Sequence, residues 1–133
     1  MNYLIRRRTK EDCKDIAHIV TVCWNETYKG IVPDWFLEEL RNNEDERAEK
    51  SYNEFDENNN NQFVLEVDNK AVGFVNFGIT SDEEYQNCGE IFALYIISEY
   101  KGNGFGKKLV ETAKNELKNM GYNKMIIACL KGN

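Results

Sequence analysis

Apolar residues recur along the N-terminal part of the chain first with a strand-like and then with a helical period. A short apolar segment occurs at 3–5. After it, apolar residues recur three or four positions apart, as on one face of a helix. Thr9 and Asp12 precede that stripe in a capping-box pattern, with Asp in place of the usual Glu. The pattern predicts a strand at 3–5 and then a helix whose apolar stripe is Cys13, Ile16, Ala17, Val20, Cys23, Trp24 and Thr27.

A turn, a second helix and a long polar segment are predicted next. Gly30 is suited to end the first helix, and Asp34 is suited to cap the second. Residues 41–62 hold three basic and seven acidic side chains, so this segment cannot form a core alone. We expect an exposed helix or loop there, with the asparagine run 58–61 as a turn or connector. Its acidity is typical of a solvated surface, and attraction of a cationic substrate is the alternative interpretation.

The C-terminal half reads as strands around one further helix. Segments 63–67 and 71–79 flank a tight turn and predict a hairpin. The nearly continuous apolar run 88–97 is typical of a buried central strand. A helical stripe at 107–120 and an apolar strand at 125–130 follow. The last two strands and their helix form a βαβ unit, which predicts parallel pairing with a right-handed crossover.

The overall pattern and composition describe one globular domain of the α/β class, with a mixed α+β sheet, over residues 1–133. Hydrophobic residues make up 41% and charged residues 30%, with a single proline. The net charge of −6 argues against a duplex-DNA binder that works by neutralising phosphates, so no nucleic-acid partner is expected. Neither a secretory leader nor a run of about 20 apolar residues occurs, so we expect a cytoplasmic protein without a membrane partner.

The four cysteines do not indicate a metal site. They lie far apart without a CxxC pair, and His18 is the one histidine that could join them. In a reducing compartment the simpler interpretation is that they act mostly as small buried hydrophobic residues. No metal is therefore expected.

A glycine-rich loop between the buried strand and the last helix carries the strongest chemical signal. Residues 101–106 read KGNGFG and lead into a lysine pair, and the stretch 101–131 has seven lysines against two glutamates. Glycines allow close backbone approach, and a helix N-terminus attracts an anion such as a phosphate. The spacing fits neither a Walker loop nor a dinucleotide fingerprint. A plain glycine-rich turn is the structural alternative.

The loop and its surroundings resemble the GNAT N-acetyltransferase family. Lys101-x-x-Gly104-x-Gly106 is similar to that family's acyl-CoA signature, Q/R-x-x-G-x-G/A. The stretch 90–110 resembles the central strand and pyrophosphate loop, and 24–33 resembles the first helix and turn of many bacterial members. The resemblance implies a GNAT-like acyltransferase fold with acetyl-CoA as cofactor.

The sequence also departs from the family pattern. Lys101 stands where Gln or Arg is usual, and Ser98 where proline is common. Family members continue beyond the strand that ends near Leu130 with a helix and further strands, which this sequence is expected to lack. Asn133 aligns with the residue that opens that part and is expected to contact the cofactor.

The resemblance implies direct transfer of acetyl from acetyl-CoA to a primary amine of a small molecule or peptide. Leu94, Tyr95 and Ile96 would offer backbone groups to the pantetheine arm, and one of their N–H groups would polarise the thioester oxygen, which gives Tyr95 a catalytic role by this route. The pyrophosphate would lie over Lys101, Gly102, Asn103, Gly104, Gly106 and Lys107.

A proton acceptor for the amine and an acceptor pocket follow from the same resemblance. Glu90 lies in an apolar strand, alternates with Phe92, Leu94 and Ile96, and matches a position where some relatives carry a catalytic glutamate, so it is the candidate base. The alternative is that it faces solvent without a role. Trp24 and Tyr28 are the candidate substrate-side residues, with core packing as the alternative.

Two other classes of function stay open at the level of sequence. One is a non-catalytic acyl-CoA-binding module or subunit derived from the same fold. The other is an interaction domain without a cofactor, which would leave the glycine loop and its lysines without a role. Exposed strand edges would invite pairing with a second chain, so a homodimer is expected.

Overall fold

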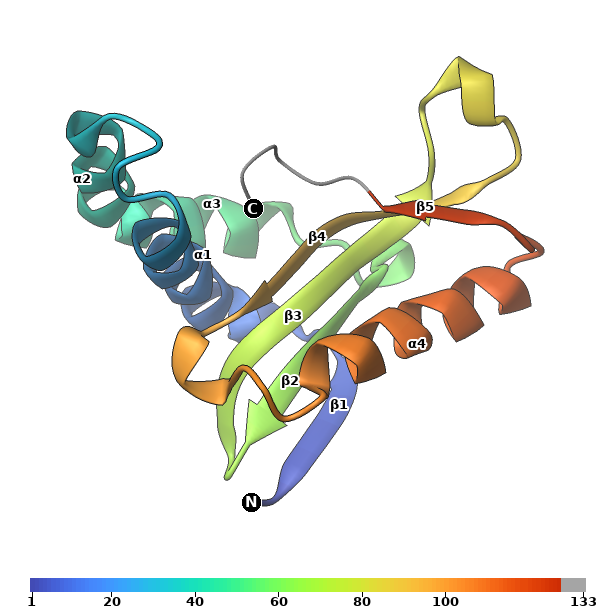
Figure 1. Cartoon of the computed structure of the whole chain (residues 1–133), viewed down its shortest axis with the longest axis horizontal. Coiled ribbons are helices and arrows are strands. Elements are labelled where there is room, and N and C mark those ends of the chain that lie inside the picture. Colours follow the sequence, from blue (N-terminus) through green and yellow to red (C-terminus); the bar gives the residue numbers. More distant parts are fainter. Residues whose placement is uncertain (128–133) are drawn as a thin grey trace.

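A mixed sheet forms the centre of the fold in the computed structural model, which describes residues 1–127 (Figure 1). Neighbouring strands pair in an antiparallel manner as far as the fourth strand, and the fourth and fifth pair in parallel. The predicted mixed sheet and parallel βαβ unit are thereby confirmed. Within the described residues the strands follow one another in the order β1 (Tyr3–Arg7), β2 (Gln62–Val67), β3 (Lys70–Ile79), β4 (Gly89–Ile96) and β5 (Met125–Ile127).

The predicted hairpin joins β2 to β3 through a two-residue turn. Asp68 and Asn69 have φ values of 50° and 69°, the left-handed conformation that tight hairpin turns require. Asp and Asn tolerate that conformation better than other residues with side chains. The turn therefore fixes the register of the hairpin, in which Val67 lies opposite Lys70.

Helices cover both faces of the sheet (Figure 1). α1 (Cys13–Thr27) packs on one face beside α2 (Asp34–Asn42) and α3 (Glu44–Glu54), and α4 (Phe105–Asn119) packs on the other. The expected capping box forms, since the Thr9 backbone N–H donates to the Asp12 carboxylate at 2.7 Å. The polar segment 41–62, for which helix and loop were both open, is helical through α3 and reaches β2 by a short 3-10 turn.

Two hydrophobic cores hold these layers together. On the α4 face, Leu109, Ala113 and Leu117 are at most 1% exposed, and burying each leucine contributes about 1.5–3 kcal/mol. On the α1 face, Ile19 and Cys23 pack against the sheet. The strand residues of the first core are Leu65, Val67, Val72, Val75, Phe77, Ile91 and Ile96, and those of the second are Val64, Ala71 and Phe74.

A β-bulge interrupts β4 where it pairs with β3. Asn76 lies opposite Ala93 but Phe77 lies opposite Ile91, so Phe92 has no partner residue on β3. An extra residue of this kind shifts the side-chain alternation by one position. Before the bulge, odd-numbered residues of β4 therefore point to the same face of the sheet as even-numbered residues do after it.

The bulge corrects the expected position of Glu90. Leu94, Ile96 and Ile91 all contact the core beneath α4. Because neighbouring strand residues point to opposite faces, Glu90 lies on the α1 face. The prediction that Glu90 shares a face with Leu94 and Ile96 is thus wrong, since it assumed unbroken alternation.

The described cysteines are small buried side chains, as expected. Cys13, Cys23 and Cys88 are free and at most 7% exposed, and Cys129 lies outside the described residues. Among residues 1–127 no helix is long and apolar enough to cross a membrane.

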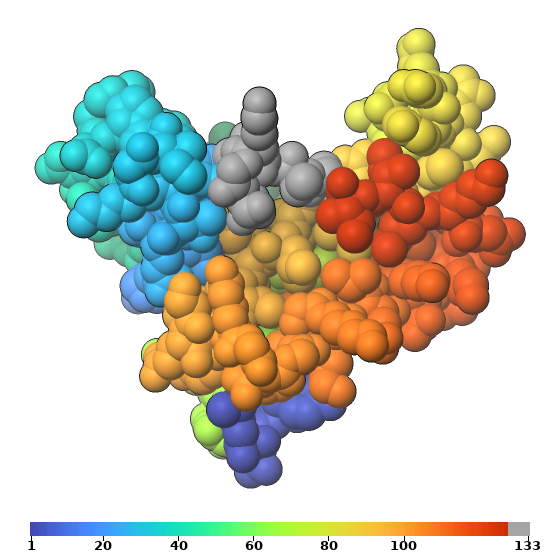
Figure 2. Space-filling view, in the orientation of Figure 1, coloured from blue at the N-terminus to red at the C-terminus, as the bar shows by residue number. Residues whose placement is uncertain are grey.

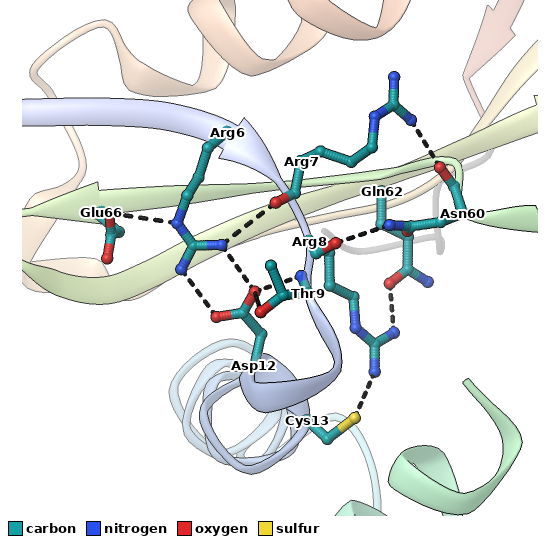
Figure 3. A network of polar contacts seen from close by, with 9 residues as sticks. All are labelled: Arg6, Arg7, Arg8, Thr9, Asp12, Cys13, Asn60, Gln62 and Glu66. Carbon is teal, nitrogen blue, oxygen red and sulfur yellow. Dashed lines mark hydrogen bonds and ion pairs between the residues drawn. The ribbon is translucent and has the colours of Figure 1, made fainter. Parts of the chain in front are cut away.

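A partly buried ion pair links the first strand to the start of α1 (Figure 3). The guanidinium of Arg6 donates two 2.8 Å hydrogen bonds to Asp12 and also pairs with Glu66 of β2 at 3.3 Å. Burial works against the charged Asp12, but the hydrogen bonds from Arg6 and Thr9 prevail and hold the pKa of Asp12 below its ordinary value of 3.8. Asp12 and Glu66 in turn raise the pKa of Arg6.

Replacing Asp12→Asn should therefore destabilise the fold in a pH-dependent way. A carboxyl group whose pKa is lowered on folding contributes stability above its ordinary pKa and loses it as the pH falls through the folded value. We expect a loss of about 1–3 kcal/mol at pH 7, because Arg6 loses its two short charge-assisted hydrogen bonds and keeps only the longer ion pair with Glu66. The difference from the wild type should shrink below pH 3.8. Denaturant unfolding at several pH values measures it, with the exposed Glu49→Gln as control, and a pH-independent difference would contradict the role of the pair.

Candidate active site

A cavity of about 130 Å³ lies where the C-terminal end of α1 meets the end of β4. Figure 2 shows β4 recessed between the blue α1 segment and the red β5 segment. The cavity thus joins two parts of the chain that are far apart in sequence. Its lining residues are Cys23, Thr27, Tyr28, Leu94, Tyr95, Ile96 and Lys101.

Side-chain contacts fix α1 against the end of β4. The indole N–H of Trp24 donates to the Tyr95 hydroxyl at 3.0 Å, and the rings of Trp24 and Tyr28 lie 4.4 Å apart between centroids. The backbone N–H of Ser98 donates to the Glu26 carboxylate at 3.1 Å. The cavity is therefore bounded by a helix end and a strand end that are tied together.

The backbone groups of the three β4 residues do not all point the same way. The N–H of Ile97 donates to Val72 O on the β3 side of β4 at 3.0 Å. Because N–H directions alternate along a strand, the N–H of Tyr95 also points toward β3. Those of Leu94 and Ile96 point to the opposite side. This differs from the expectation that all three residues offer backbone groups to one ligand. The backbone N–H of Tyr95 points toward β3, and only its side chain extends to the α1 face.

Cys23 is a protonated thiol within this cavity. Burial raises its pKa to about 11, with help from the nearby negative charge of Glu26. Lys101 and the Ile96 N–H act in the other direction but do not prevail. Since the thiolate is the nucleophilic form, Cys23 is a poor nucleophile at neutral pH.

The glycine loop next to the cavity forms a cradle at the start of α4. Gly102 and Gly104 have φ values of 85° and 79°, a conformation that is strained for a residue with a side chain. Apart from the chain neighbours, no described residue has an atom within 4 Å of where a Cβ would be. Gly104 is the N-cap residue of α4, and no side chain of residues 1–127 caps the helix. The first N–H groups of α4 are thus available to an external acceptor.

The electrostatics of the cradle favour an anion. The first turn of α4 has no acidic residue, and Lys101 and Lys107 are exposed on either side of the loop. The positive end of the helix dipole adds to these charges. Open space, free donors and positive charge together fit a phosphate or diphosphate group.

The structure brings most of the predicted site residues together. Tyr28 and the segment 94–96 share the cavity with Lys101, and the loop 102–107 adjoins it. Trp24 stands behind Tyr95 as its hydrogen-bond donor and does not line the cavity. The expected cofactor contact at Asn133 lies outside the described residues, as does the rest of the strand beyond Ile127.

Glu90 stands apart from this cavity. It is four residues from Leu94, about 13 Å at the usual rise of a strand. Its half-buried carboxylate accepts a 2.6 Å hydrogen bond from the hydroxyl of Thr80. It therefore belongs to the start of β4 on the α1 face, and it is not among the residues that line the cavity.

Sequence reasoning missed three residues of this region. Cys23 and Thr27 line the cavity, although their helical spacing suggested only a core stripe. Asn76, a polar residue inside an otherwise apolar strand, has a buried Oδ1 without a hydrogen-bond partner and lies opposite Ala93 of β4. The break in apolar pattern at Asn76 was the available signal. No group of three or more potential metal ligands occurs among the described residues.

Comparison with known proteins gives one consistent family. The model of the acetyltransferase (GNAT) family matches residues 24–133. The uncharacterised N-acetyltransferase YuaI of Bacillus subtilis is 29% identical over 130 residues, which cover 97% of this chain and 72% of that protein. An uncharacterised N-acetyltransferase of Archaeoglobus fulgidus is 32% identical over 113 residues, with 82% and 69% covered.

Solved structures give the same picture. The PaiA N-acetyltransferase of Thermoplasma acidophilum, determined in complex with coenzyme A, superposes on the whole chain and on 82% of its own length. The TM-score is 0.82 and the sequence identity 25%. The overall arrangement of sheet and helices is therefore that of N-acetyltransferases of known structure.

Proposed function

The chain belongs to the GNAT acetyltransferase family, and from this premise we propose that it transfers acetyl from acetyl-CoA to a primary amine of a small molecule or peptide. One observation carries the proposal. Among the described residues no side chain caps the N-terminus of α4, which follows β4 through a loop with two left-handed glycines. That arrangement offers backbone donors to a diphosphate next to a cavity large enough for a narrow chain.

The residues of the loop fit the cofactor. When bound, acetyl-CoA supplies an acetyl group activated as a thioester. Gly102, Asn103, Gly104 and Gly106 offer backbone N–H groups to the pyrophosphate in this proposal, with Lys101 and Lys107 as flanking cations. Lysine acts there as a point charge, without the planar fork of arginine.

The β4 residues bind and polarise the reacting end of the donor in this proposal. The N–H groups of Leu94 and Ile96 point away from β3, and that of Ile96 lies beside the Cys23 thiol. Leu94 is therefore the better donor to the thioester oxygen, where negative charge develops. Tyr95 has a supporting role, because its hydroxyl binds Trp24 and fixes α1.

The amine attacks directly, and Glu90 accepts its proton through water. A covalent intermediate on Cys23 is disfavoured because that thiol is protonated at neutral pH. Glu90 lies on the α1 face, the same face as Ala93 and Tyr95, and Thr80 holds its carboxylate in place. A carboxylate at that position suits a base that acts through a chain of water molecules.

The acceptor side of the site is assigned to the end of α1. Tyr28 lines the cavity, and Trp24 shapes it from behind Tyr95. The net charge of −6 favours a cationic amine through long-range attraction. One domain over 1–133, a cytoplasmic location and a homodimer stay predictions.

A matched pair of glycine variants tests the cradle. Gly104→Ala places a side chain at a φ of 79° and into the open space of the loop, so we expect coenzyme A affinity to fall at least about tenfold. Gly106→Ala meets Ile96 Cδ1 at an ordinary 3.6 Å and should bind within about threefold of the wild type. Titration calorimetry measures both, and melting curves verify that each variant is folded. Equal affinity in the two variants would remove the loop from the site.

Glu90→Gln tests the base, with acetyl-CoA thiol release as the assay. The amines are a polyamine, free amino acids, a peptide N-terminus and an aminoglycoside. We expect kcat to fall about 10²–10⁴-fold, and the decline of activity at low pH to disappear, because glutamine cannot take up the proton. The exposed Glu99→Gln removes the same charge beyond the other end of β4 and should change neither. An unaltered pH profile in Glu90→Gln would contradict the role.

Thiol release also tests the proposed function as a whole. If the folded wild-type chain binds acetyl-CoA but releases no thiol with any amine, the transfer reaction is contradicted and the binding-module interpretation gains support. Release with one amine class identifies the acceptor. Melting with and without acetyl-CoA verifies binding, because a ligand of the folded state raises the midpoint.

A further inference from the structure

A second cavity is lined by most of the described residues that have a buried polar atom without a partner. Among the described residues four such side-chain atoms occur, and three of them, Arg8 Nε, Arg47 Nε and Asn60 Oδ1, belong to residues that line this one cavity. It has a volume of about 450 Å³ and lies between the end of β1, the start of β2 and α3. Lys50, Glu54 and Asp56 also line it.

Arg8 differs from the two arginines that precede it (Figure 3). Arg6 pairs with Asp12 and Glu66, and Arg7 pairs with Glu116. Arg8 has no carboxylate within ion-pair distance among residues 1–127. Its guanidinium donates instead to neutral groups: the Gln62 side chain, Cys13 Sγ at 2.9 Å and Ser51 Oγ at 2.7 Å.

The burial of Arg8 makes this arrangement costly. The residue is 8% exposed, and a buried charge without a counter-charge is strongly disfavoured. A guanidinium carries five N–H donors, and the described contacts use three of them. The stacking of Phe55 at 5.2 Å offsets part of the charge but accepts no conventional hydrogen bond.

The other cations of the cavity are also without acidic partners in the described part of the chain. Arg47 donates to Thr21 Oγ1 and to the Leu40 carbonyl, each at 2.7 Å, and has no ion pair there. Lys50 is exposed at the rim. The carboxylate of Asp56 accepts a 3.0 Å hydrogen bond from the Asn58 backbone instead of meeting a cation.

We propose that this second cavity binds a small oxyanion, the carboxylate or phosphate group of a metabolite, as the counter-ion of Arg8 and Arg47. The planar fork of arginine suits both groups. The bound anion would link α3 to the β1 and β2 ends, which now share only neutral contacts with Arg8. This site is separate from the acetyl-transfer site, because β2 and β3 lie between β1 and β4.

The test uses the whole chain without acetyl-CoA and two probes, sodium phosphate and sodium succinate. Each is titrated by calorimetry and by thermal melting against sodium chloride at equal ionic strength. We expect saturable binding of at least one probe, with a rise in the melting midpoint. Arg47→Gln should weaken probe binding about tenfold or more. Lys50→Gln should weaken it about threefold, because its charge is exposed. Lys118→Gln removes an exposed charge from α4 and should have no effect.

The variants also separate this site from the cradle at α4, which attracts anions as well. Binding that is lost in Arg47→Gln but kept in Gly104→Ala supports the second cavity whether or not acetyl transfer occurs. Binding lost in Gly104→Ala but kept in both Arg47→Gln and Lys50→Gln belongs to the cradle and overturns the proposal. So does the absence of saturable binding of either probe. Because Lys50 is exposed, its variant is expected to fold even if the Arg47 variant does not. A response to one probe alone distinguishes a phosphate from a carboxylate ligand.

Discussion

The first backbone N–H groups of α4 need an acceptor that the described side chains do not provide, and the rest of the candidate site depends on this. Gly104 occupies the capping position, where Ser, Asp or Asn would accept those hydrogen bonds. The left-handed glycines keep the space in front of the helix open. Such a loop makes the helix less stable than a capped one. In return, the N–H groups and the positive end of the helix dipole form an anion site in which both the charge and the direction of the donors are fixed.

β4 connects this anion site to the chemistry. The strand ends shortly before the glycine loop and begins next to Glu90. Between these points, the backbone N–H groups of Leu94 and Ile96 point away from β3. The bulge at Phe92 places Glu90 on the face that α1 covers, while Leu94 and Ile96 pack beneath α4. One strand thus supplies groups to both faces of the sheet, and the contact of Trp24 with Tyr95 holds the acceptor side against it.

Much of this arrangement could be predicted from the sequence because local signals encode it. The hairpin turn at Asp68, the apolar run of β4 and the glycine loop are each specified by residues within a few positions. The bulge could not be predicted, because it arises from pairing with β3 and no glycine or proline marks it in β4. The sequence also could not predict that Arg8 has no acidic side chain beside it, because the neighbours of Arg8 come from α3 and β2.

Amide hydrogen exchange with and without acetyl-CoA reports on each of the backbone donors that are proposed to hold the cofactor. We expect slower exchange at the N-cap residue Gly104, at Phe105 and Gly106 in the first turn of α4, and at Leu94 on β4. Exchange at α3, on the far side of α1, should be unchanged. Calorimetrically verified binding that leaves the first turn of α4 unprotected would contradict the claim that these N–H groups hold the cofactor.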